Sequence, residues 1–122
     1  MPNSNRQRGD YLERQTRAAL RAHGWIVVRS GGSLGVADIV ALRAGNTPLL
    51  VSCKLNGQQP RQERIALVEA ARTAGARPLL ACRVMRGYVD FYAVMIEPGL
   101  RHVDHVKVPA RPGKEGDDDA AP

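Results

Sequence analysis

Apolar side chains recur at intervals of three and four residues in one segment near the start of the chain. This spacing predicts a helix over residues 10–23. Its apolar face would consist of Leu12, Thr16, Ala19, Leu20 and His23. Asp10 suits the N-cap position, with Glu13 three residues later as in a capping box, and Gly24 is expected to end the helix. The polar residues 1–8 before it are predicted to form a flexible N-terminus.

Short runs rich in apolar residues follow, and each of them predicts a β-strand. The strands are expected at residues 25–29, 36–42, 48–55, 78–84 and 89–95. A second helix is predicted from residue 60 or 61 to about residue 73, and Gly75 stops it. Several runs are almost entirely apolar, as is typical of strands that are covered on both faces. The order αβββαββ therefore predicts an α/β fold, with a mixed β-sheet flanked by helices.

The last residues, 109–122, differ in composition from the rest, because Pro, Gly, Asp and Ala dominate them. We expect them to form a disordered acidic tail after a single domain at residues 9–108. The tail holds two basic and four acidic residues, so residues 1–108 carry a net charge of +8 where the whole chain carries +6. A body of that charge attracts polyanions such as nucleic acids. Solubility alone would also explain it.

The cysteines and the lack of long apolar runs limit the class of protein. Cys53 and Cys82 both lie inside apolar runs, which favours reduced thiols over a disulfide framework. No apolar run approaches the ~20 residues that a membrane helix needs. The first ten residues contain no hydrophobic segment of a signal peptide. We therefore expect a cytoplasmic protein with no membrane partner.

One carboxylate and one ammonium group interrupt neighbouring apolar runs. Asp38 lies within the run at 36–42, where burial of its charge is costly unless a partner compensates it. Lys54 ends the next run, and a hairpin turning at Gly45 and Asn46 would bring both side chains to the same open end. A salt bridge across the hairpin is one explanation. The other is a site for phosphodiester hydrolysis, in which Asp38 binds a hard cation and Lys54 holds water or stabilises the phosphate.

Several short motifs occur in a fixed order around this pair. The chain reads GDYLER at 9–14, GWIVVR at 24–29, a serine- and glycine-rich loop at 30–35, and DIVAL at 38–42. Over residues 9–95 this arrangement resembles the PD-(D/E)xK nuclease superfamily, and more narrowly the archaeal and phage Holliday junction resolvases. The resemblance implies a restriction-endonuclease-like fold and a metal-dependent endonuclease for four-way DNA junctions. It also implies a homodimer that uses Mg²⁺, with Mn²⁺ as a possible substitute.

The same resemblance implies roles for individual residues. Glu13 and Asp38 would bind the metal together with the carbonyl of Cys53, Lys54 would position or activate water, and Ser33 would touch the scissile phosphate. Further contacts with DNA are expected from Arg14, Arg29, Ser30, Ser33, Gln58, Arg61 and Arg64. For Gln58, Arg61 and Arg64, a solvated helix face is nearly as good an explanation.

The chain departs from the family pattern at one position. The second strand usually carries Glu-x-Lys, whereas here it reads Ser52-Cys53-Lys54. One interpretation is that the missing acid has moved to the following helix, where Glu63 is preferred over Glu69 because it lies in the first turn. Alternatively, Glu63 only stabilises the N-terminal turn of that helix through the helix dipole. The other interpretation is a degenerate site in a DNA-binding module that does not cut. A restriction- or repair-type nuclease on the same fold also remains open.

Overall fold

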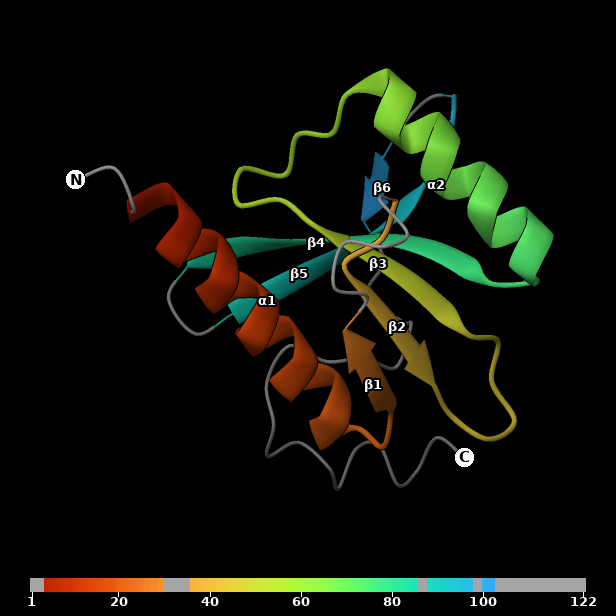
Figure 1. Ribbon diagram of the computed structural model, residues 1–122, viewed down its shortest axis with the longest axis horizontal. Helices are drawn as coiled ribbons and strands as arrows, with labels where there is room; N and C mark the ends of the chain where they lie inside the picture. Colours follow the sequence, from red (N-terminus) through yellow and green to blue (C-terminus); the bar gives the residue numbers. More distant parts are fainter. Residues whose placement is uncertain (1–3, 30–35, 86–87, 98–99, 103–122) are drawn as a thin grey trace.

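The computed structural model describes residues 4–29, 36–85, 88–97 and 100–102 (Figure 1). In chain order the elements are α1 (Ser4–Ala22), β1 (Ile26–Arg29), β2 (Ile39–Leu42), β3 (Leu49–Cys53), α2 (Arg61–Ala74), β4 (Arg77–Met85), β5 (Tyr88–Val94) and β6 (Leu100–His102). The strands form one sheet in the order β1-β2-β3-β4-β5-β6. Among the described strands, only β3 and β4 pair in parallel, with α2 between them in the chain. The predicted mixed sheet flanked by helices is confirmed, and β6 is an addition that the sequence pattern did not predict.

The two helices cover opposite faces of the sheet, which Figure 1 shows as a layer between α1 and α2. Side chains of β3 alternate between the two resulting cores. Leu49 and Val51 pack in the cluster that includes Leu12 of α1, whereas Leu50 packs in the cluster that includes Leu67 of α2. This double coverage explains why the sequence of β3 is almost continuously apolar.

Helix α1 begins at Ser4, six residues before the predicted start. Asp10 therefore lies inside the helix, and the predicted N-cap and capping box at Asp10 and Glu13 are wrong. Residues 4–8 belong to the helix, although no apolar stripe marks them, because Asn, Gln and Arg are compatible with helical backbone. The predicted ends are confirmed: α1 stops before Gly24 (φ 90°), and α2 stops before Gly75 in the left-handed conformation (φ 66°). The predicted tail, 109–122, lies outside the described residues.

The C-terminal end of α1 is tied to the turn of the β2–β3 hairpin. The guanidinium of Arg43 stacks over the ring of Trp25, 4.3 Å from its centroid. Arg43 also donates to the carbonyl of His23 (2.5 Å) and to Oδ1 of Asn46 (2.9 Å). Gly45 completes the turn with a positive φ of 77°. Among the described residues, no helix has the length and apolar character to cross a membrane.

Candidate active site

Asp38 lies immediately before β2, at the end of the hairpin away from its turn. The register pairs Ile39 with Val51, so Asp38 comes opposite Ser52 and not opposite Lys54. The backbone N–H of Asp38 donates to the carbonyl of Val51 (2.9 Å). In return, Oδ2 of Asp38 accepts a hydrogen bond from the N–H of Cys53 (2.8 Å). The carboxylate in this apolar region is thus compensated by a backbone donor of the neighbouring strand.

Lys54 pairs with an acid of α2, not with Asp38. Its Nζ lies 2.9 Å from Oε1 of Glu63, and the two side chains are 34% and 50% exposed. The salt bridge across the hairpin is therefore not the arrangement observed. Asp38 and Lys54 nevertheless border the same cavity of about 420 Å³, which confirms that the hairpin brings them to one end. The remaining residues that line this cavity are Val36, Ala37, Ser52, Gln62, Glu63 and Ala66.

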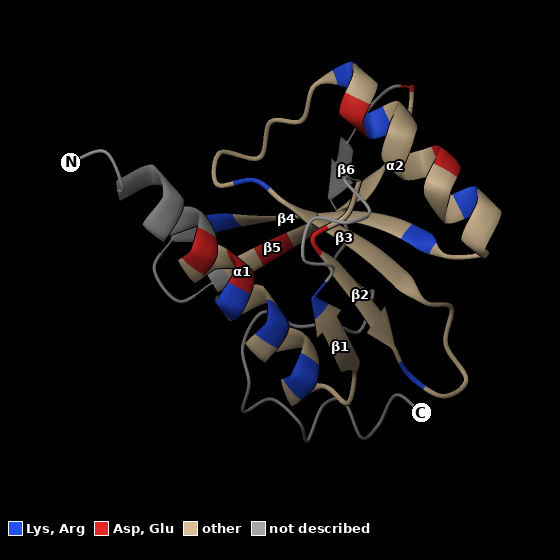
Figure 2. Cartoon of the chain, viewed as in Figure 1, with Lys and Arg blue, Asp and Glu red and all other residues tan. Residues whose placement is uncertain are grey.

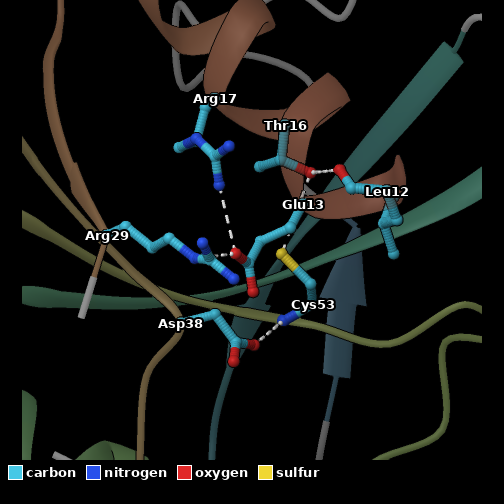
Figure 3. Close-up of polar contacts among 7 residues, drawn as sticks. All are labelled: Leu12, Glu13, Thr16, Arg17, Arg29, Asp38 and Cys53. Carbon is cyan, nitrogen blue, oxygen red and sulfur yellow. Dashed lines mark hydrogen bonds and ion pairs between the residues drawn. The ribbon is translucent and has the colours of Figure 1, made fainter. Parts of the chain in front are cut away.

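Glu13 belongs to α1, which covers the face of the sheet opposite to α2, and it approaches Asp38 from that side (Figure 3). Its Oε1 forms ion pairs with Nη1 of Arg17 (3.1 Å) and with Nε of Arg29 (2.9 Å). The side chain of Glu13 is only 16% exposed. In Figure 3 the other carboxylate oxygen of Glu13 is turned toward Asp38. Glu13 borders a smaller cavity of about 160 Å³, whose lining includes Arg14. The two predicted metal ligands thus both lie near Cys53, at the end of β3, but border different cavities.

Cys53 lies close to both of these carboxylates. Its thiol donates to Oγ1 of Thr16 (3.8 Å), and Thr16 itself donates to the carbonyl of Leu12 (2.8 Å). Burial raises the pKa of the Cys53 thiol to about 12, and the negative charges of Asp38 and Glu13 add to the effect. The thiol is therefore neutral near pH 7. The resemblance assigns any contribution of Cys53 to a metal site to its backbone carbonyl.

The donor groups around the larger cavity fit a hard cation. They are the carboxylates of Asp38 and Glu63, the hydroxyl of Ser52 and the amide of Gln62, all of which offer oxygen. Within the described part of the chain, no group of three or more His, Cys, Asp or Glu residues could hold a metal ion. Mg²⁺ is commonly bound by one or two carboxylates, and substrate phosphates and water complete its shell. The site fits a cation of that kind better than one enclosed by protein.

The predicted DNA contacts divide between the two helical sides. Arg14 is exposed and lies over the ring of Tyr11, 5.9 Å from its centroid, and Arg29 is 60% exposed at the end of β1. On the other side, Arg61 pairs with Glu97 (3.1 Å), Arg64 donates to the carbonyl of Gln59 (2.8 Å), and Gln58 is exposed. Figure 2 shows basic and acidic segments alternating along α2. Ser30 and Ser33 lie outside the described residues.

Two residues at the site were not singled out from the sequence. Gln62 borders the larger cavity, and no motif marks it. Arg17 contacts Glu13 from one turn further along α1, and here a signal existed: Glu and Arg four residues apart on a helix face each other. Glu69, the less favoured acid, is exposed on α2 and is not part of the cavity lining.

Comparisons with known proteins place this chain in a family. The model of the archaeal Holliday junction resolvase family (Hjc) matches residues 4–110. The 1.6 Å structure of Hjc from Archaeoglobus fulgidus, a Holliday junction resolvase from an archaeal hyperthermophile, is similar with a TM-score of 0.61 and 25% sequence identity, covering 83% of this chain and 87% of that chain. No curated protein matches the chain significantly. Since the family match spans most of the sequence, the chain belongs to the archaeal Holliday junction resolvase family.

Proposed function

We propose that this junction nuclease hydrolyses phosphodiester bonds of four-way DNA with a divalent cation, Mg²⁺ or Mn²⁺, at the cavity bordered by Asp38, Lys54 and Glu63. Family membership supports the junction as substrate. The observation that carries the chemistry is the convergence of these three side chains, from three separate segments, at the end of β3. Asp38 and Lys54 are the pair that the DIVAL motif and the apolar strand indicated.

Asp38 and Lys54 have separable roles in this proposal. The Cys53 N–H fixes Oδ2 of Asp38, so that Oδ1 is the oxygen that would hold the cation. The chemistry that Mg²⁺ supplies when bound is polarisation of the scissile phosphate and ionisation of a water molecule. The ammonium of Lys54, held by Glu63 at 2.9 Å, donates hydrogen bonds to that water or to the phosphate as its negative charge increases.

Glu63 is our candidate for the acid that Ser52 does not supply. Ser52 is 5% exposed and borders the same cavity, so its hydroxyl is near the family position of the carboxylate without its charge. Glu63 borders the cavity from the first turn of α2, and we assign it with Asp38 to the metal. Glu13 borders the neighbouring cavity, and we propose that a bound cation would draw it toward these two acids, because the three do not form one cluster in the described structure. Ser52 also favours a second candidate function, a DNA-binding module whose nuclease site is degenerate.

The DNA and the second subunit complete the proposal. Phosphate contacts would come from Arg14 and Arg29 beside Glu13, and further contacts from Ser30, Ser33, Gln58, Arg61 and Arg64. Two matched cuts in a four-way junction require two identical sites, which a twofold homodimer supplies. Sedimentation equilibrium should then give about twice the chain mass of 13.3 kDa. The free thiols of Cys53 and Cys82 suit the reducing cytoplasm, where we propose that the protein acts.

The test of the proposed function is cleavage of a labelled mobile four-way junction in Mg²⁺ or Mn²⁺, with a linear duplex of the same sequence as the control. Wild type should cut the junction and not the duplex. Asp38→Asn should abolish cutting and retain junction binding in EDTA, because the amide keeps the side-chain shape but loses the charge that holds the cation. Binding by wild type without cutting in either metal would establish the second candidate function instead.

A further inference from the structure

The two arginines that hold Glu13 differ in origin and in exposure. Arg17 is one turn further along the same helix and its side chain is 16% exposed, whereas Arg29 ends β1 and is 60% exposed. Both contact the same oxygen, Oε1 (Figure 3). Either arginine can therefore leave without removing the other contact, and Oε2 of Glu13 takes part in neither ion pair.

The surroundings of the two guanidiniums indicate which one stays. Arg17 is near enough to the Cys53 thiol for its charge to lower the pKa of that group, which places it on the inner side of α1. Arg29 is more exposed and directly precedes the serine- and glycine-rich segment 30–35. A phosphate that approaches this end of the sheet reaches the guanidinium of Arg29 more readily than that of Arg17, and guanidinium binds phosphate oxygens as well as it binds carboxylate.

We infer that Arg17 is a positioning residue for cleavage: it keeps the Glu13 carboxylate oriented toward Asp38 while Arg29 turns to the DNA. This inference rests on the proposed function, since it assigns Glu13 to the cleavage site. Arg17 acts only through Glu13 and does not touch DNA. Without Arg17, the departure of Arg29 leaves the carboxylate free to rotate about its side-chain bonds. Misplacement of a catalytic group by ~1 Å costs about 100-fold in rate.

The experiment separates junction affinity, measured in EDTA, from the cleavage rate constant at saturating protein with Mg²⁺. Arg17→Met, Arg17→Lys and Arg29→Met are compared with Arg21→Met, which removes the same charge from the exposed last turn of α1. For Arg17→Met we expect a rate about 100-fold lower, with junction affinity equal to that of Arg21→Met. Arg17→Lys should recover a large part of the rate, because an ammonium also reaches Glu13 from four residues away. Arg29→Met should weaken junction affinity because one phosphate contact is lost. The slope of log K against log salt concentration should become less steep by about 0.9.

Several outcomes would overturn the inference. A loss of affinity by Arg17→Met as large as that of Arg29→Met would make Arg17 a DNA contact. A wild-type rate for Arg17→Met would make the pair with Glu13 dispensable. Equal inactivity of Arg17→Met and Arg17→Lys, together with a lower melting temperature of both, would mean a role in folding. If wild type cuts no junction, the proposed function itself fails, whereas cutting by wild type and Arg17→Met alike removes only the role of Arg17.

Discussion

Replacing Glu63 with Gln tests whether the acid missing at Ser52 has moved to α2. The substitution keeps the size of the side chain and removes one negative charge. In the folded protein that charge lies 2.9 Å from Nζ of Lys54, and the two side chains are 50% and 34% exposed. Ion pairs that are so accessible to water contribute less than about 1 kcal/mol to stability. The free energy of unfolding should therefore change little.

The effect of Glu63→Gln on cleavage should be far larger than its effect on stability. Loss of a metal-binding carboxylate that also holds Lys54 should lower the single-turnover rate about 100-fold, which corresponds to ~2.7 kcal/mol of transition-state stabilisation. The assay is cleavage of a labelled four-way junction at saturating protein, with urea unfolding of the same sample. Glu69→Gln is the matched control, because Glu69 is an exposed acid on the same helix outside the cavity lining. A Glu63→Gln rate within about fivefold of wild type would refute the assignment of Glu63 to the metal.

Three further predictions concern stability. Leu67→Ala, in the core under α2, should lower the free energy of unfolding in urea by about 2–5 kcal/mol, because the side chain is 0% exposed; a loss below about 1 kcal/mol would contradict that packing. The raised pKa of Cys53, about 12 against 9.0, means that the folded state keeps a proton that the unfolded state loses above pH 9. Stability should thus fall as pH rises from 9 toward 12, by about 1.4 kcal/mol at pH 10 relative to pH 8; Cys53→Ala should lack this part of the slope, and identical slopes would refute the shift. Arg43→Met, which removes the stack on Trp25, should cost about 1 kcal/mol in the same urea titration, and an unchanged midpoint would show that the stack is not stabilising.

The sequence was sufficient to predict the layers of the fold and to bring Asp38 and Lys54 to one end of the hairpin as a candidate site, because the relevant signals are local. The apolar runs located β2 and β3, and the turn at Gly45 joined them into a hairpin. Asp38 then had to lie at the open end. The register could not be predicted, because β3 is covered on both faces and its side chains show no alternation of apolar and polar positions. The pairing with Ser52 opposite Asp38 depends on contacts between whole strands.

The partners of the predicted residues depended on tertiary packing. Lys54 pairs with Glu63 only because the first turn of α2 lies near the end of β3, a placement that no local pattern encodes. The first turns of α1 were missed because residues 4–8 have no apolar stripe in the sequence, and a helix that has been nucleated extends by adding one hydrogen bond per residue. The contact of Arg29 with Glu13 likewise joins β1 to α1. The pairing of Arg17 with Glu13 differs from these contacts, because their spacing of four residues within α1 is a local signal.

Trp25 is the single tryptophan of the chain, and it lies at the end of β1 opposite to Arg29. The residue is 5% exposed, and Arg43 covers its ring at the turn of the hairpin and not at the Asp38 end. The tryptophan fluorescence of the protein therefore comes from one indole that reports the docking of α1 on the hairpin. Emission from this indole should follow unfolding without direct quenching by DNA bound near Asp38. The folding of every active-site variant can thus be monitored in the same cuvette as its junction substrate.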